Sequence, residues 1–266
     1  MNKYIYNLKK DMLDDRDFKF AALMKKKVKL PLNIDLRDCY SEIKDQGNLG
    51  ACTAFSACSL IEYLLDKNVD LSELYFYYKE REAEGDINVD SGSSIRQSAK
   101  TAKNTGTCRE ELHPYNVEKF DETPSAAAEL DAPNHKVNAY YRLNTIHEIM
   151  YNLGELRKPV LLRVDVYESF EAVGGDGYIS MPDTFSEELL GYHAVNICGY
   201  FWEKNHKSQG GWLKKILDIL LRRNKYYGLY FIIRNSWGSE FGDKGYMYAP
   251  AEFIERHSGD WWYLEI

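Results

Sequence analysis

The strongest constraint on the fold of this chain is a change of pattern between its two halves. From Cys52, apolar residues recur on one helical face until about residue 66, and two further helices are predicted to begin near 72 and to cover 94–104. Beyond Pro133 the apolar residues gather instead in short strand-like runs. The predicted strands are 137–143, 160–166, 194–200 and 229–233, with a short helix at 145–156 between the first two. A helical half followed by a strand half is typical of an α+β fold with two lobes.

The 266 residues are enough for one large domain or two small lobes. We expect a helical lobe at 30–132 and a β-rich lobe at 133–266, preceded by a charged N-terminal arm at 1–29. Two interpretations of the arm stay open, a short inhibitory pro-segment and a structural arm that packs on the fold.

Composition and charge narrow the possible functions. The formal net charge of −7 argues against a nucleic-acid partner. The five cysteines are an odd, sparse set without metal-ligand spacing, so we expect no disulfide framework, no metal and no cofactor. No run approaches the roughly 20 apolar residues of a membrane span, and the N-terminus lacks the apolar core of a signal peptide. We therefore expect a reducing, cytoplasmic location, or association with the virion if the protein is viral.

Cys52 is the candidate nucleophile, because the predicted helix begins at or just after it. A thiol reacts as the thiolate, and the positive end of a helix dipole lowers its pKa. The Cys52 amide, unpaired at a helix start, can donate to a developing oxyanion, and Gln46 can supply a second donor from its side chain. An isolated cysteine is more often a small buried side chain. That interpretation is assigned to the other four, Cys39, Cys58, Cys108 and Cys198.

Three segments together resemble the papain family of cysteine peptidases. They are Gly50-Ala51-Cys52, His193-Ala194-Val195, and the long run 235–246, which begins Asn235-Ser236-Trp237-Gly238 and is highly specific for the family. Leu49 and Thr53 depart from the family pattern, which has a Cys and an aromatic residue there. The resemblance is strongest to the bacterial and viral branch that lacks the usual disulfides. It implies a papain-like fold with the active site in a cleft between a helical N-terminal lobe and an antiparallel, β-barrel-like C-terminal lobe.

The resemblance also implies a role for each site residue. Cys52 attacks the scissile carbonyl, His193 forms the ion pair with it and protonates the leaving amine, and Asn235 orients His193. Gln46 and the Cys52 amide form the oxyanion hole. Residues implied to contact the substrate or to shield the site are Ser91, Gly92, Tyr192 and Trp237.

The function implied is hydrolysis of peptide bonds in a peptide or protein substrate through a thioester acyl-enzyme. Two alternatives remain open at this stage. One is a peptide ligase or acyl transferase, in which an amine intercepts the acyl-enzyme on the same triad. The other is a catalytically silent peptide-binding module.

An insertion at about 201–227 separates two of the predicted strands. Within it, residues 212–223 place leucines and isoleucines on one face of a basic helix. Such a helix can lie on an anionic membrane surface or bind a partner. The alternative is a helix that docks on its own protein.

Overall fold

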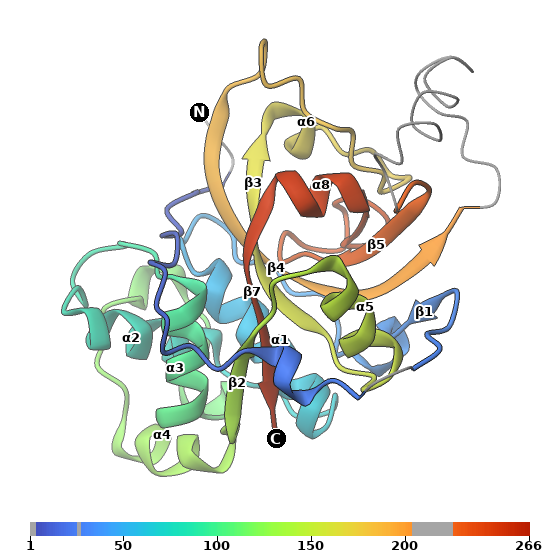
Figure 1. Ribbon diagram of the computed structural model, residues 1–266. Helices are drawn as coiled ribbons and strands as arrows, with labels where there is room; N and C mark the ends of the chain where they lie inside the picture. The colour runs from blue at the N-terminus through green and yellow to red at the C-terminus, as the bar shows by residue number, and fades with distance from the viewer. Residues whose placement is uncertain (1–3, 26–27, 204–225) are drawn as a thin grey trace.

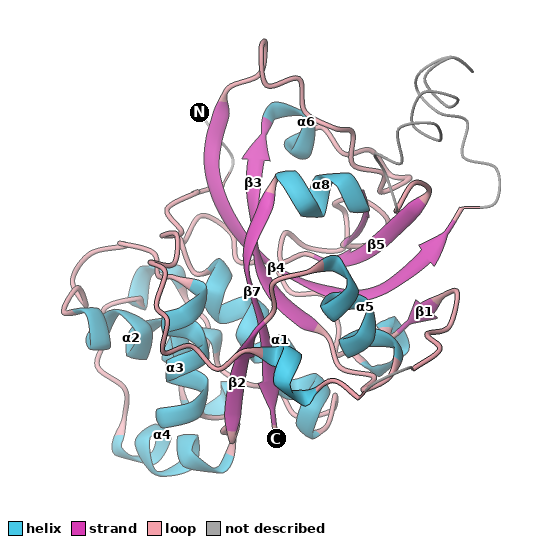
Figure 2. Cartoon of the chain, viewed as in Figure 1, coloured by secondary structure: helices cyan, strands magenta, loops and turns pink. Residues whose placement is uncertain are grey.

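The computed structural model describes residues 4–25, 28–203 and 226–266. Helices gather on one side of the molecule and an antiparallel sheet forms the other, as Figures 1 and 2 show. The helical side contains α1 (Cys52–Leu65), α2 (Glu73–Glu84), α3 (Ile95–Asn104) and α4 (Ala126–Asp131). The sheet side adds α5 (Ile146–Gly154), α6 (Glu168–Glu171) and α8 (Ala251–Arg256).

Local sequence explains where the two helices after α1 begin. The hydroxyl of Ser72 accepts the Tyr75 amide at the start of α2, and that of Ser94 accepts the Gln97 amide at the start of α3. Gly85 ends α2 with φ +81°, a left-handed conformation that glycine adopts without strain. These caps fix the loop between α2 and α3, which borders the site described below.

The sheet has the strand order β2-β7-β3-β4-β5-β6, and β1 pairs with β4 off this path. Every pairing between these strands is antiparallel. The strands are β1 (Ile34–Asp35), β2 (Ala139–Arg142), β3 (Val160–Tyr167), β4 (Leu189–Trp202), β5 (Leu229–Arg234), β6 (Tyr246–Pro250) and β7 (Ser258–Glu265). The central strand β4 packs against α1, so it lies at the junction of the two lobes.

Two large apolar clusters fill the lobes. The cluster under the helices contains Cys52, and it also takes Ala194 and Trp262 from the sheet. The cluster on the other face of the sheet contains Trp237 and residues of α5 and α8. Because both clusters include residues of β4, the two lobes pack against one another through this strand.

The predicted α+β architecture is confirmed, and the predicted helices and strands before 204 lie where expected to within a few residues. The pattern missed β6 and β7, and it placed the start of the insertion too early, since Phe201 and Trp202 belong to β4. The predicted basic helix at 212–223 lies outside the described residues. All five cysteines of the chain are described, and each is free. Among the described residues, no helix is long and apolar enough to cross a membrane, and the predicted cytoplasmic location stays a prediction.

Candidate active site

Cys52 is the first residue of α1 and is 1% exposed. The residue before it, Ala51, provides no side-chain cap, so the first amides of the helix have no side-chain acceptor. A backbone hydrogen bond from Ala194 reaches the thiol. This contact places Cys52 next to the residue that follows His193 on β4.

His193 and Asn235 come from the adjacent strands β4 and β5, where Asn235 follows the last residue of β5. The His193 Nε2 lies 2.7 Å from Asn235 Oδ1. The Ser236 amide donates to the same Oδ1 at 2.9 Å, which fixes that atom as the oxygen of the amide. Nε2 therefore carries the proton, and Nδ1, which has no hydrogen-bond partner, presents its lone pair. In this tautomer the imidazole can accept a proton at Nδ1.

Trp237 covers the His193–Asn235 hydrogen bond. Its ring centroid lies 4.7 Å from that of His193, and its own exposure is 2%. Phe170 and Phe241 contact it edge-on at 5.7 and 4.7 Å. The indole excludes water from the imidazole, so the hydrogen bond lies in a low-dielectric environment.

Gln46 is fully buried and held at both ends of its side-chain amide. Ser236 donates its hydroxyl to Gln46 Oε1 at 2.7 Å, and Gln46 Nε2 donates to the Leu49 carbonyl at 3.0 Å. The amide nitrogen carries a second hydrogen, which is available to an oxyanion. Leu49 lies three residues before Cys52, so the same turn fixes Gln46 and leads into α1.

The sequence matches the papain family cysteine protease description over residues 30–254. The chain belongs to the papain family. Among its papain-family relatives, an uncharacterized peptidase C1-like protein of Acanthamoeba polyphaga mimivirus is 29% identical over 94% of this chain and 79% of its own length. A cathepsin L-like proteinase of Fasciola hepatica is also 29% identical, over 82% of this chain and 60% of its own length.

Among solved papain-family structures, xylellain, a cysteine protease from Xylella fastidiosa, has a TM-score of 0.79 at 27% identity. The match covers 100% of this chain and 98% of xylellain. These relatives agree with the predicted resemblance to bacterial and viral members of the family. The family match starts at residue 30 and leaves the N-terminal arm outside it.

The Cys52 thiol and the His193 imidazole are both neutral. Burial is the main cause that raises the pKa of the Cys52 thiol to about 12; a backbone hydrogen bond from Ala194 opposes it, and the carboxyl group of Glu80 adds a smaller upward effect. Burial also lowers the pKa of His193 to about 4, against a smaller opposing effect of its hydrogen bond to Asn235. A thiolate–imidazolium pair needs a more polar surrounding than the one described here.

The N-terminal arm, drawn in dark blue in Figure 1, lies against the site. Residues 4–10, here called the cleft segment, contact the turn before α1, the loop before α3 and the start of β4. Asn7 forms a parallel bridge with Tyr192, and its side chain is so close to Gly50 that a Cβ there would lie 2.2 Å from Asn7 Oδ1. A Cβ on Gly191 would likewise lie 2.6 Å from Tyr6. Only glycine fits at these positions while the arm is in place.

The predicted substrate-binding residues lie along this segment. Gly92, with φ +64°, faces the Asn7 backbone, and a Cβ there would meet the Asn7 carbonyl at 2.3 Å. Tyr192 pairs with Asn7, whereas the Ser91 hydroxyl donates only to its neighbour, the Gly92 carbonyl, at 3.3 Å. The backbone hydrogen bond to the arm is made by Ser93, whose carbonyl accepts the Lys9 amide at 2.9 Å.

Sequence reasoning missed three residues that organise the site. Ser93 is the last extended residue before Ser94 caps α3, and that cap was the signal available in the sequence. The Asp90 carboxylate accepts the Gly50 amide at 3.1 Å and the Tyr77 hydroxyl, so it ties the loop before α3 to the turn before Cys52. Ser236 holds Gln46, a contact between residues 190 positions apart that no local pattern indicates.

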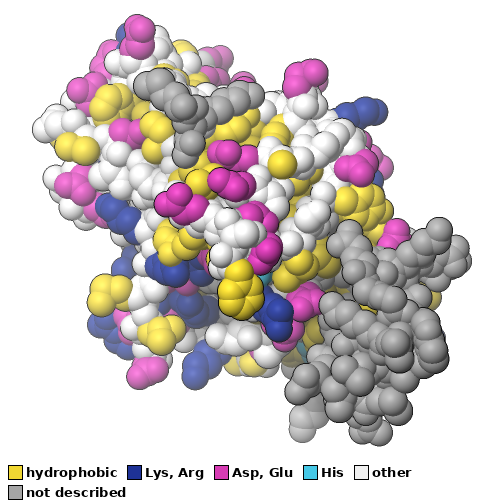
Figure 3. Space-filling view, turned by 90° about the horizontal axis from the view of Figure 1, so that it is seen from above, with side chains coloured by type: hydrophobic (Ala, Val, Ile, Leu, Met, Phe, Trp, Pro, Cys, Tyr) yellow, Lys and Arg dark blue, Asp and Glu magenta, His cyan; other side chains and the backbone are white. Residues whose placement is uncertain are grey.

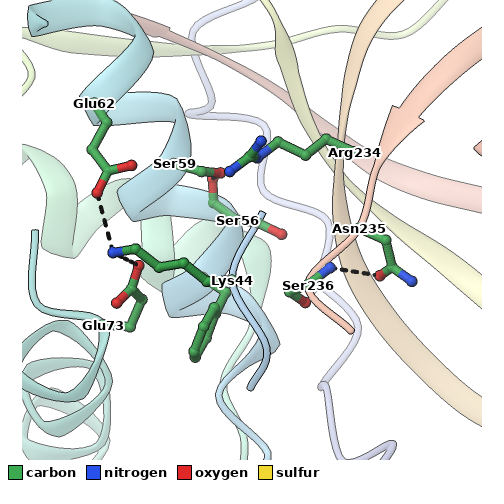
Figure 4. Close-up of a pocket in the computed structure, with 9 residues that line it drawn as sticks. Lys44, Ser56, Ser59, Glu62, Glu73, Arg234, Asn235 and Ser236 are labelled. Atoms are coloured by element: carbon green, nitrogen blue, oxygen red, sulfur yellow. Dashed lines mark hydrogen bonds and ion pairs between the residues drawn. The ribbon is translucent and has the colours of Figure 1, made fainter. Parts of the chain in front are cut away.

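A second polar group lies on the far side of Asn235 and Ser236. Figure 4 shows Lys44 between Glu62 and Glu73, at 3.4 and 2.7 Å from their carboxylates. The cavity that these residues line measures about 10 Å³, room for no more than a water molecule. Its residues Asn235 and Ser236 also belong to the site, so this polar group supports one wall of it.

Proposed function

We propose that this chain is a cysteine endopeptidase that hydrolyses peptide bonds through a thioester, with Cys52 as nucleophile and His193 as base. The observation that carries the proposal is the His193–Asn235 hydrogen bond, which sets a tautomer with a free Nδ1 lone pair next to the start of α1. The family match over residues 30–254 supports the same chemistry.

In the proposed reaction the Cys52 thiol transfers its proton to His193 Nδ1, and the thiolate attacks the substrate carbonyl carbon. The resulting oxyanion accepts hydrogen bonds from the Cys52 amide and from the second hydrogen on Gln46 Nε2. The imidazolium then protonates the leaving amine, which departs and leaves a thioester. Water, deprotonated by the same imidazole, attacks the thioester, releases the carboxylic acid and restores the thiol.

The same proposal assigns the arm an inhibitory role. The cleft segment covers Gly50, Gly92 and Gly191, the surfaces that a peptide substrate needs in order to reach Cys52. Leu8 of this segment belongs to the same apolar cluster as Cys52, and burial keeps both the thiol and the imidazole neutral. We expect the chain to be latent until residues 4–10 leave the cleft.

A peptide or protein is the partner that this site fits best. The face shown in Figure 3 carries both acidic and basic side chains among hydrophobic ones, and the whole chain has a formal net charge of −7. A net negative charge does not favour the phosphate backbone of a nucleic acid.

The exposed loop after the cleft segment allows a direct test. Met12 and Leu13 are 83% and 90% exposed, so a recognition sequence for a serine endopeptidase can be inserted after Leu13 without entering the core. After cutting, the serine endopeptidase is inactivated with a serine-specific reagent, and a thiol-reactive probe and a peptide library are added. We expect labelling of Cys52 and cleavage of peptides, both increased by about 10²–10³-fold over the uncut chain, because an intramolecular arm acts at millimolar effective concentration.

The matched control is the same cut in the Cys52→Ala variant, which should give neither labelling nor cleavage. Product that forms only when an amine is supplied would support the ligase alternative. A cut chain that is neither labelled nor active would support the silent peptide-binding module. Equal activity before and after the cut would overturn the inhibitory role of the arm.

A further inference from the structure

Lys9 in the cleft segment occupies a site formed by the end of α2. Its amide donates to the Ser93 carbonyl at 2.9 Å, which places its side chain over the last residue of the helix. The ammonium lies 2.6 Å from the Glu84 carboxylate and 3.7 Å from that of Asp86. The other Glu84 oxygen accepts the Ser93 hydroxyl at 3.4 Å. One residue, Ser93, thus contacts both the backbone of the occupant and the acid that binds its side chain.

We call Glu84 and Asp86 the α2 acid pair. Among the described residues, the ion pairs of both carboxylates are with Lys9. The nearest arginine on the helix, Arg81, directs its guanidinium to the carbonyls of Ile87 and Phe120 instead. When the arm leaves the cleft, the acid pair therefore loses its cation.

The acid pair lies at the C-terminal end of α2, where loss of the Lys9 cation is unfavourable. The C-terminal end of a helix carries partial negative charge, so carboxylates there are destabilised and a cation is stabilised. Glu84 is the last residue of α2, and its side chain is 20% exposed. A site with this electrostatic character attracts a basic side chain from whatever peptide next enters the cleft.

The neighbouring residue of the arm shows what lies beside this site. Leu8 is 3% exposed and belongs to the same apolar cluster as Leu49 and Ala194, which flank the catalytic Cys52 and His193. Asn7 lies against Gly50, close to the nucleophile. The cation site is therefore two residues along the peptide from the position beside Cys52.

We propose that Glu84 and Asp86 determine substrate specificity by binding a lysine or arginine side chain of the peptide, two or three positions from the bond that is cleaved. This inference rests on the proposed peptidase function. It predicts that preferred substrates resemble the cleft segment, in which the apolar Leu8 is followed by the basic Lys9.

The test uses the chain cut after Leu13 and pairs of fluorogenic peptides. The two peptides of a pair are identical except at one position, which is lysine in one and its uncharged analogue norleucine in the other. Different pairs place this substitution at successive positions along the peptide. We expect kcat/KM to favour lysine by about 1.5- to fivefold at one position, the range for partly exposed ion pairs. In the Glu84→Gln/Asp86→Asn variant this ratio should fall to about one. In a Glu84→Lys/Asp86→Lys variant, peptides with glutamate at that position should become the better substrates.

Glu82→Gln is the matched control, since Glu82 lies on the same helix and pairs with Lys79 at 2.6 Å, away from the arm. It should leave the lysine preference unchanged. A lysine preference that survives in the Glu84→Gln/Asp86→Asn variant, or the absence of any such preference in the unsubstituted enzyme, overturns the proposal.

A binding measurement separates this inference from the peptidase function itself. The cut Cys52→Ala chain is titrated with a fluorescent peptide of residues 4–11, carrying either lysine or norleucine at position 9. Tighter binding of the lysine peptide that depends on the acid pair supports the cation site even if no peptide is hydrolysed. If the enzyme hydrolyses peptides but shows no lysine-dependent binding, the peptidase function is supported and the cation site is contradicted.

Discussion

The two halves of the N-terminal arm contact the protein in different ways. Residues 4–10, the cleft segment, lie across the site, where Asn7 lies against glycines, Tyr4 stacks on Trp237 and Leu8 is buried. Residues 14–24, here called the anchor segment, lie away from the site and are held by contacts with α3 and the sheet. The Arg142 amide donates to the Phe18 carbonyl at 2.7 Å, Arg96 pairs with Asp17, and Phe20 is fully buried against Tyr263.

The difference indicates that one continuous arm combines a removable part with a permanent one. Between them the chain is exposed at Met12 and Leu13, so the cleft segment can leave while the anchor segment stays. The two interpretations of the arm left open by the sequence, inhibitor and structural element, therefore apply to different halves of it. A chain shortened to start near residue 30 would lose both at once.

The largest expected effect is a difference in the free energy of unfolding between substitutions in the two halves of the arm. Phe20→Ala should lower the free energy of unfolding by about 3–5 kcal/mol, the usual cost of removing a buried aromatic ring, without raising peptidase activity. Leu8→Ala should cost much less, because the cleft segment can detach without global unfolding, and should raise activity several-fold. Urea denaturation and peptide hydrolysis measure the two quantities. Equal destabilisation by both substitutions, with no activation, would contradict the division of the arm.

A second effect concerns pH, because His193 is fully buried. The folded-state pKa of His193, about 4, is below its ordinary value near 6.5, so the unfolded chain takes up the proton first as pH falls. The stability contributed by the neutral imidazole is complete above pH 6.5 and decreases by up to about 3 kcal/mol as pH falls to 4. We expect this decrease in the Cys52→Ala chain, measured by denaturation at a series of pH values.

Two controls assign the pH effect. The additional substitution His193→Gln should remove that part of the decrease, since glutamine does not titrate. Cutting the loop and removing the cleft segment should also reduce it, because the imidazole regains contact with water. An unchanged pH dependence in either case argues that other groups are responsible.

The smallest expected effect tests one contact of the cleft segment. Tyr4 stacks on Trp237 with centroids 4.1 Å apart and an interplanar angle of 8°. Tyr4→Ala should weaken the arm by about 0.5–1.5 kcal/mol and raise activity roughly two- to tenfold. Phe18→Ala is the control in the anchor segment, where an exposed ring tilts against Tyr141, and it should leave activity unchanged.

The sequence predicted the family and the fold class, while the roles of the site residues stay predictions. The start of α1 at Cys52 and the pairing of His193 with Asn235 both agree with the residues chosen from the sequence. What the sequence did not predict depends on contacts between distant segments. The arm that covers Gly50, the Ser236 hydroxyl that holds Gln46 and the strand β7 beside β3 have no signature in spacing or periodicity.

The dipeptide Asn235-Ser236 joins two parts of the proposed chemistry that are usually considered separately. Asn235 sets the tautomer of His193, the proposed base, and Ser236 holds the Gln46 amide, the proposed oxyanion donor. A small rotation of this one stretch of backbone would therefore disturb proton transfer and charge stabilisation together. The effects of substitutions at Gln46 and Asn235 should consequently be coupled instead of additive, since both residues depend on the same peptide unit.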